Sequence, residues 1–133
     1  PLYPLLKHKP GFLFEAAQCL SKTRQFEQAN EYLRRAVLLS ADPMLYYMMA
    51  KNEQSLGQYR QAEKHLLHAI DILPERIYPY YLLMNLYTEP SYFQPAKLKM
   101  AIDSVLTKKP KVESSAIKEM KEKARSMLNN TSI

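Results

Sequence analysis

The chain has 133 residues, a formal net charge of +6 and one cysteine, and 47% of its residues are hydrophobic. A chain of this length buries enough surface to fold without a metal or a disulfide, and a lone cysteine excludes an internal disulfide. The sequence holds no apolar run long enough to cross a bilayer as a helix. The sequence contains only two glycines and is rich in Leu, Ala, Lys, Glu and Gln. This composition favours helices throughout.

Residues 1–10 contain three prolines and are predicted to form an extended lead-in or the end of a linker. Their apolar side chains are expected to pack on the first helix: Leu2, Tyr3, Leu5 and Leu6. The first residue is Pro1, and no signal-peptide pattern follows it. We therefore expect a fragment of a longer protein or a processed form.

The first pair of helices is predicted at residues 11–23 and 25–39. A break of only two residues, Thr23 and Arg24, separates them. Helices joined by so short a turn lie antiparallel, so the pattern predicts a helical hairpin. The apolar residues of the first helix recur every three or four positions on one face: Leu13, Ala16, Ala17 and Leu20.

The second pair is predicted at residues 43–55 and 58–74. Asp42 is placed to cap the first of these helices, and Pro43 suits its first turn. Gly57 fits a C-terminal stop. The buried residues expected on the first helix of this pair are Tyr46, Met49 and Ala50.

A fifth helix is predicted at residues 78–88, opened by Pro79 and ended by Pro90. A sixth helix is expected to begin at Phe93. The last helix, residues 114–129, has a charged side and an apolar side, as a terminal cap requires. The apolar side carries Ile117, Met120, Ala124, Met127 and Leu128.

The second helices of the hairpins form an internal repeat, which is the strongest organising signal in the sequence. Five residues of one copy precede their counterparts by 33 positions: Phe26, Ala29, Leu33, Ala36 and Val37 before Tyr59, Ala62, Leu66, Ala69 and Ile70. A third copy is predicted to start at Phe93 and Ala96, with Met100 in the place of Leu66 and Asp103 in the place of Ala69.

This pattern resembles the tetratricopeptide repeat over residues 11–110. The resemblance rests on Phe26/Tyr59/Phe93, Ala29/Ala62/Ala96, Leu33/Leu66/Met100, Ala36/Ala69, Gly57 and Pro74. It implies an all-α fold of about three antiparallel helical hairpins stacked in a right-handed superhelix, with a C-terminal capping helix. The implied organisation is a lead-in at 1–10, repeats at about 11–42, 43–75 and 76–110, and a capping helix and tail at 111–133.

Residues 9–37, 76–87 and 108–124 are also similar to the soluble C-terminal region of O-antigen ligase-like membrane proteins of the Bacteroides group. That resemblance implies a soluble domain tethered to the bacterial inner membrane through a parent chain, whose membrane part would carry out glycan transfer for surface polysaccharide. The domain itself would be non-catalytic, would need no cofactor and would dock a protein or peptide partner. The side of the membrane and the oligomeric state stay open.

Stacked hairpins of this kind have a concave wall lined by the first helix of each hairpin, which suits an extended peptide or a helix. The residues expected in this groove are Phe14, Gln18, Lys22, Met44, Tyr47, Lys51, Gln54, Tyr78, Tyr81, Asn85 and Thr88. Alternatively, Tyr47 and Tyr81 pack between repeats, because interface and core aromatics look alike in sequence. Tyr47→Ala is expected to spare the fold and to test binding.

A competing surface is basic, because residues 97–133 carry a net charge of +5 and residues 1–96 only +1. An acidic partner, anionic lipid or phosphorylated glycan would meet Lys97, Lys99, Lys108, Lys109, Lys111 and Lys121. A solvated helix face explains the same charges. Nucleic acid is not expected, since the lysines are spread along helices with no accompanying reading motif.

Catalytic and metal sites are not expected. His65 and His68 share one helical face, but two ligands do not close a zinc site, so we expect exposed histidines. Cys19 is expected to be a small helical residue. The sequence holds no nucleophile elbow, glycine-rich phosphate loop or paired acid–base set. The basic cluster that grips a C-terminal carboxylate in some relatives is not reproduced, since Phe14 stands where a basic group is expected.

Overall fold

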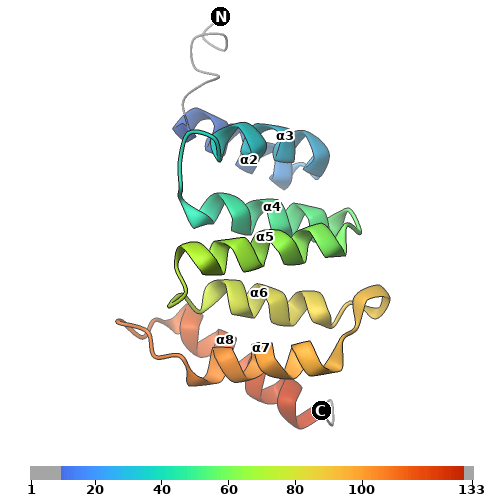
Figure 1. The fold of residues 1–133 in the computed structure, drawn as a ribbon, viewed down its shortest axis with the longest axis vertical. Helices are drawn as coiled ribbons and strands as arrows, with labels where there is room; N and C mark the ends of the chain where they lie inside the picture. Colours follow the sequence, from blue (N-terminus) through green and yellow to red (C-terminus); the bar gives the residue numbers. More distant parts are fainter. Residues whose placement is uncertain (1–9, 131–133) are drawn as a thin grey trace, which may run out of the picture. The chain divides into compact units, whose positions relative to one another are not determined.

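The computed structural model describes residues 10–130, and every regular element in that range is a helix, which confirms the all-α prediction (Figure 1). The chain divides into two units, and the boundary in the sequence falls between Ile72 and Leu73. Unit 1 contains α2 (Pro10–Lys22), α3 (Phe26–Ala36), α4 (Pro43–Ser55) and α5 (Tyr59–Ile72). Unit 2 contains α6 (Tyr78–Tyr87), the short 3₁₀ helix η1 (Pro90–Tyr92), α7 (Pro95–Thr107) and α8 (Ser115–Asn130). The expected packing of Leu2, Tyr3, Leu5 and Leu6 lies outside the described residues.

Unit 1 consists of two helical hairpins, α2–α3 and α4–α5 (Figure 1). Both hairpins turn through a residue with positive φ, Arg24 at 64° and Gly57 at 77°, and these two positions are 33 residues apart. In each turn the amide after that residue donates to a carbonyl five residues back, Gln25 to Leu20 and Gln58 to Glu53, both at 2.8 Å. Gly57 adopts this geometry without steric cost, whereas a residue such as Arg24 pays about 1 kcal/mol.

The alanines of the repeat are buried, as the sequence predicts. Ala29, Ala36, Ala62 and Ala69 have almost no exposed surface, and Leu33 and Leu66 between them are equally buried. Small side chains let a neighbouring helix come close, and the leucines fill the space alongside. The repeat therefore encodes helix packing in both hairpins.

Helix α4 is buried on more than one side because it contacts both α3 and α5. Leu45 and Met49 belong to the apolar core formed with α2 and α3. The Tyr46 ring packs against the same core, and its centroid lies 4.6 Å from that of His68 and 5.9 Å from that of His65, both of α5. Tyr46 is only half-buried, in contrast to the prediction.

A chain of polar contacts crosses the core of unit 1. Ser21 donates to the Asn52 amide oxygen at 2.9 Å, and Asn52 donates in turn to the Asn30 amide oxygen at 2.8 Å. Asn30 then donates to the Met49 carbonyl at 3.3 Å. These bonds join α2, α3 and α4, so they fix the register of the first hairpin against α4.

Helix α3 ends at Ala36, three residues before its predicted end. The next amides bond only three residues back, Leu38 to Arg35 and Leu39 to Ala36. Both leucines are exposed, so no core contact continues the helix past this tightened turn.

In unit 2 the predicted third copy of the repeat is wrong in its register. Phe93, Ala96 and Met100 are exposed, Met100 at 70%. The buried residues of α7 that reproduce the spacing of Ala62, Leu66 and Ala69 are Leu98, Ile102 and Val105, each 36 positions later. Helix α7 accordingly begins at Pro95, after η1, because the connection from α6 to α7 (residues 88–94) is longer than the turns at residues 23–25 and 56–58 in unit 1.

Helix α8 packs on α7 and also touches α6, with Ala124 as its fully buried residue. Its Lys121 ammonium donates to the carbonyls of Lys108 at 2.8 Å and Leu106 at 3.3 Å. Carbonyls at the end of a helix have no partner within it, so Lys121 satisfies the end of α7.

We expect Ala62→Leu to lower the free energy of unfolding by roughly 1–3 kcal/mol, because the extra carbons have no room at a buried helix contact. Urea unfolding followed by circular dichroism measures this change. Gln61→Leu adds a similar side chain at an exposed position of the same helix and is expected to change stability by less than about 0.5 kcal/mol. Equal stability of the two variants would contradict this packing role.

Candidate functional site

Most predicted groove residues of unit 1 reach the surface. On α2, Phe14 and Gln18 are half-buried and Lys22 is exposed. On α4, Met44 and Lys51 are exposed and Gln54 is half-buried. Unit 1 therefore presents amide, cationic and apolar groups on the two helices that the sequence assigned to a binding wall.

Lys22 and Lys51 start from neighbouring parts of the backbone. The Ser21 hydroxyl bonds the Asn52 side chain at 2.9 Å, and these residues directly adjoin Lys22 and Lys51. Two exposed ammonium groups thus extend from the place where α2 and α4 approach each other. We call the half-buried Gln18 and the exposed Lys22, Met44 and Lys51 the α2–α4 face.

Tyr47 is an exception among the groove residues, since only 6% of its surface is exposed. The sequence assigned one buried face to α4, but this helix contacts α3 and α5 on different sides. The prediction that Tyr47→Ala spares the fold is therefore replaced by the opposite expectation.

The groove residues predicted in unit 2 lie along α6 and its C-terminal end. The rings of Tyr78 and Tyr81 stack at 6.4 Å, and the Lys123 ammonium of α8 lies 5.5 Å from the centre of the Tyr81 ring. The Thr88 hydroxyl donates to the Asn85 carbonyl at 2.6 Å. The amide oxygen of Asn85 is buried and has no hydrogen-bond partner among the described residues.

The predicted basic face separates into two groups. Three of its lysines already have contacts inside unit 2: Lys121 with carbonyl oxygens, Lys108 with the Tyr80 ring at 4.9 Å, and Lys97 with the Tyr87 ring at 6.0 Å. The remaining three are exposed: Lys99, Lys109 and Lys111. Half of the charge that suggested an anion-binding face thus contributes to local structure.

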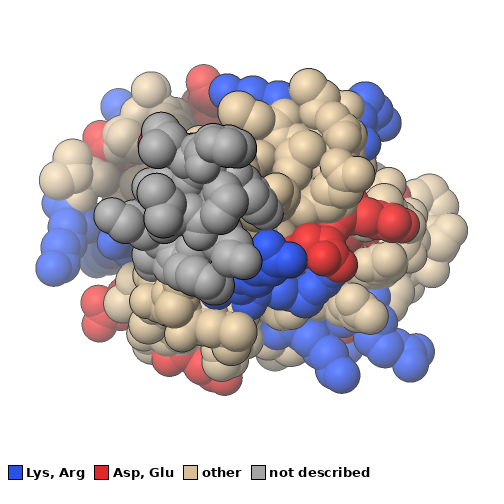
Figure 2. Space-filling model, turned by 90° about the horizontal axis from the view of Figure 1, so that it is seen from above, with Lys and Arg blue, Asp and Glu red and all other residues tan. Residues whose placement is uncertain are grey.

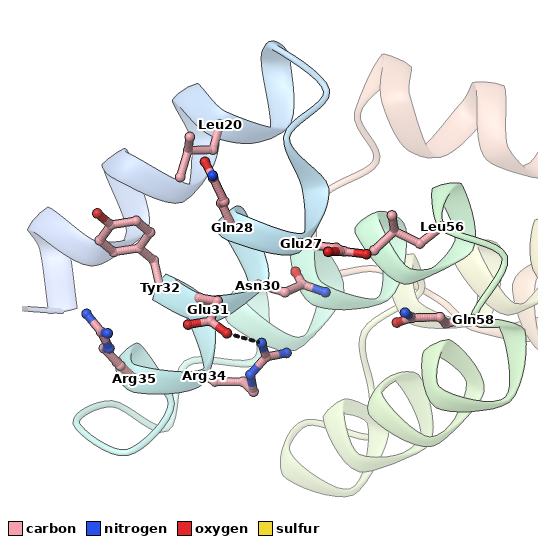
Figure 3. Close-up of a pocket in the computed structure, with 10 residues that line it drawn as sticks. All are labelled: Leu20, Glu27, Gln28, Asn30, Glu31, Tyr32, Arg34, Arg35, Leu56 and Gln58. Atoms are coloured by element: carbon pink, nitrogen blue, oxygen red, sulfur yellow. Dashed lines mark hydrogen bonds and ion pairs between the residues drawn. The ribbon is translucent and has the colours of Figure 1, made fainter.

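Unit 1 also has a surface pocket of about 660 Å³ over the outer side of α3, where no predicted groove residue lies (Figure 3). Its lining is polar and carries both signs of charge: Leu20, Glu27, Gln28, Asn30, Glu31, Tyr32, Arg34, Arg35, Leu56 and Gln58. Glu31 and Arg34 bond each other at 3.2 Å, and the Arg35 guanidinium lies 5.8 Å from the centre of the Tyr32 ring. Two of these charges thus form an ion pair, and the described lining holds no Ser, Cys or His.

The face shown in Figure 2 carries Lys and Arg atoms interspersed with Asp and Glu atoms, with other residues between them. Opposite charges in close proximity weaken the long-range field that would steer a charged partner. Local contacts would therefore decide binding at this face.

His65 has a structural contact that the sequence did not predict. Its Nδ1 atom lies 2.7 Å from an oxygen of Glu53, whose side chain is only 2% exposed. A buried carboxylate requires a partner, so His65 satisfies a group that α4 brings into the core. His68 is exposed, as expected, and contacts Tyr46. The sequence shows polar residues at regular spacing on α4 and α5. That spacing does not show which of them pair, so the Glu53–His65 contact could not be predicted.

Residues 10–130 contain no helix that is both long and apolar enough to cross a bilayer. Within the same range, no three His, Cys, Asp or Glu side chains are close enough together to hold a metal ion. Cys19 is exposed on α2.

Tyr47→Ala is expected to lower the free energy of unfolding by roughly 2–4 kcal/mol, because it removes a buried ring. Met44→Ala, at an exposed position of the same helix, is expected to cost less than about 1 kcal/mol. Thermal and urea unfolding measure both values. A fully stable Tyr47→Ala variant would restore the original assignment of this ring to the groove.

His65→Ala is expected to destabilise the fold by roughly 1–3 kcal/mol, because Glu53 loses its partner while it stays buried. His68→Ala is the matched control, since it removes a ring contact with Tyr46 but keeps the Glu53 bond, and we expect a loss of at most about 1 kcal/mol. Urea unfolding compares the two. Equal losses would show that the Glu53–His65 contact does not contribute to the stability of the fold.

The geometry of unit 1 agrees with what the comparison with protein families shows. The tetratricopeptide repeat family model matches residues 10–43 and 45–75, which contain the hairpins α2–α3 and α4–α5. A comparison with curated proteins found no match. Tetratricopeptide repeat domains are non-catalytic scaffolds that generally mediate protein–protein interactions. The part of the chain formed by α2–α5 therefore matches the tetratricopeptide repeat family.

Proposed function

We propose that this chain is a non-catalytic protein-interaction module whose α2–α4 face binds a peptide segment of a partner protein. The observation that carries the proposal is the match of residues 10–75 to a repeat family that mediates protein–protein interactions. The Ser21–Asn52 and Asn52–Asn30 hydrogen bonds join α2, α3 and α4. A rigid scaffold reduces the entropy lost on binding.

The chemistry of the α2–α4 face suits an extended peptide. Gln18 can bond backbone groups of a peptide, and Met44 supplies an adaptable apolar contact. Lys22 and Lys51 adjoin the Ser21–Asn52 bond and offer two cations from fixed backbone positions. Because Tyr47 is buried, the polar and cationic groups provide most of this contact.

The test is selection of peptides from a random library on the 133-residue chain, followed by affinity measurements on variants. We expect Lys22→Ala/Lys51→Ala to weaken the selected peptides about tenfold, because both cations face the ligand. Arg60→Ala/Lys64→Ala removes two exposed cations from α5 and is expected to leave affinity unchanged. Absence of any selected peptide, or equal affinity for both double variants, would overturn the assignment of this face.

The second candidate function is binding of anionic lipid or phosphorylated glycan by the basic face. The supporting observation is the exposure of Lys99, Lys109 and Lys111. Binding through exposed charges weakens steeply as the salt concentration rises, because ions screen them. Salt-sensitive binding to anionic vesicles that is lost in Lys99→Glu would favour this function over the peptide-binding one.

A narrower proposal follows from the resemblance of residues 9–37, 76–87 and 108–124 to O-antigen ligase-like proteins. In that proposal the domain is tethered to the inner membrane and assists surface polysaccharide assembly. Its support is the sequence resemblance alone. The sequence encoded upstream of Pro1 tests it, because a polytopic parent requires a series of long apolar segments there. Their absence would remove the ligase context while the repeat domain remained.

A further inference from the structure

Unit 2 contains a pocket of about 650 Å³ that shares no lining residue with the α2–α4 face and includes Lys109 and Lys111 of the basic face. Its walls come from the connection at residues 73–77, from the connection at residues 109–112 that follows α7, and from the first turns of α8. Two segments distant in sequence thus meet around one depression within this unit.

Part of the pocket lining is apolar. This part consists of Leu73, Ile77, Val112, Ile117 and Met120. Ile77 is buried, whereas 75% of the Val112 surface is exposed. Exposed aliphatic side chains that line a pocket are typical of binding sites.

The rim of the pocket is basic. Arg76, Lys109 and Lys111 line the pocket and are exposed, and Glu75 is the acidic residue of the lining. The neighbouring lysines do not add to this rim, because Lys108 contacts the Tyr80 ring and Lys121 bonds carbonyls. The local excess of two positive charges is therefore concentrated at the mouth of an apolar depression.

The connection that carries the rim lysines is held at both ends. At its start, Lys121 of α8 bonds the Leu106 and Lys108 carbonyls. At its end, the Ser114 hydroxyl accepts from the Ile117 amide at 3.2 Å and caps α8. Fixed ends reduce the ordering cost that a ligand would pay.

We propose that this pocket binds a linear acidic peptide with a large apolar side chain. The apolar side chain lies on Ile77, Ile117 and Met120, while flanking Asp or Glu residues face the basic rim. Charge complementarity selects this occupant. An anionic membrane fits less well, because the apolar side chains line a pocket and the exposed Glu75 is part of the same lining. The site belongs to unit 2 and does not rest on the α2–α4 face.

The probe is the amidated peptide Asp-Glu-Leu-Phe-Asp-Glu with fluorescein at its amino terminus, titrated into the 133-residue chain. Fluorescence anisotropy measures affinity, and amide chemical shifts locate the site. We expect saturable binding with shifts in residues 73–77 and 109–120. Two control peptides, one with Lys for the acids and one with Ser for Leu and Phe, are expected not to bind. No saturable binding up to about 1 mM would overturn the proposal.

Matched variants test the two halves of the site. Lys109→Glu/Lys111→Glu is expected to lower the affinity for the peptide at least about tenfold. The control, Lys99→Glu/Lys118→Glu, makes the same change in charge outside the pocket and is expected to leave the affinity unchanged. Val112→Ser is expected to weaken binding several-fold, and Met100→Ser is its control at similar exposure. Equal effects of a variant and its control would contradict the assignment.

Vesicles of phosphatidylglycerol and phosphatidylcholine provide the final comparison. We expect no vesicle binding that depends on Lys109 and Lys111. If vesicles bind through these lysines while the peptide does not, the pocket is part of a membrane-binding surface and the peptide proposal is wrong.

Discussion

The close approach of helices at small side chains is the constraint on which unit 1 depends. Ala29 and Ala36 in α3, and Ala62 and Ala69 in α5, are buried against neighbouring helices. A larger side chain at these points would push helices apart and open gaps around Leu33 and Leu66. The positions repeated at 33-residue spacing are therefore packing positions, and the side chains available for recognition lie between them.

Polar groups within this packing add specificity of register. Asn30 and Asn52 bond each other, and Glu53 bonds His65. The buried side chains of Asn30, Asn52 and Glu53 therefore each have a hydrogen-bond partner. Satisfied buried polar pairs tolerate only one alignment of the helices, since any slip would leave donors or acceptors unpaired. Apolar contacts by themselves would allow more than one alignment.

The basic end of the chain shows why charge counts overestimate binding surfaces. In unit 2, Lys108 and Lys121 contact an aromatic ring and helix-end carbonyls, and they hold the connection that follows α7. Lys109 and Lys111, from the same stretch, remain exposed at the mouth of an apolar pocket. The same residue type thus supports the fold at two positions and is available to a ligand at two others.

The sequence by itself determined the helices, the hairpins and the alanine packing, because periodic burial of one helix face is a local property of the chain. Helix α4 even has its predicted bounds, since Asp42, Pro43 and Gly57 mark its ends locally. Only the tertiary structure decided the register of α7 and the burial of Tyr47. The longer connection between α6 and α7 shifts the repeat without changing its periodicity, so Met100 was predicted to be buried and Leu98 was missed. A helix with several neighbours has no single buried face, which is why the burial of Tyr47 was not predicted. Contacts such as Glu53–His65 and Lys121 with the end of α7 join residues that only the fold brings together.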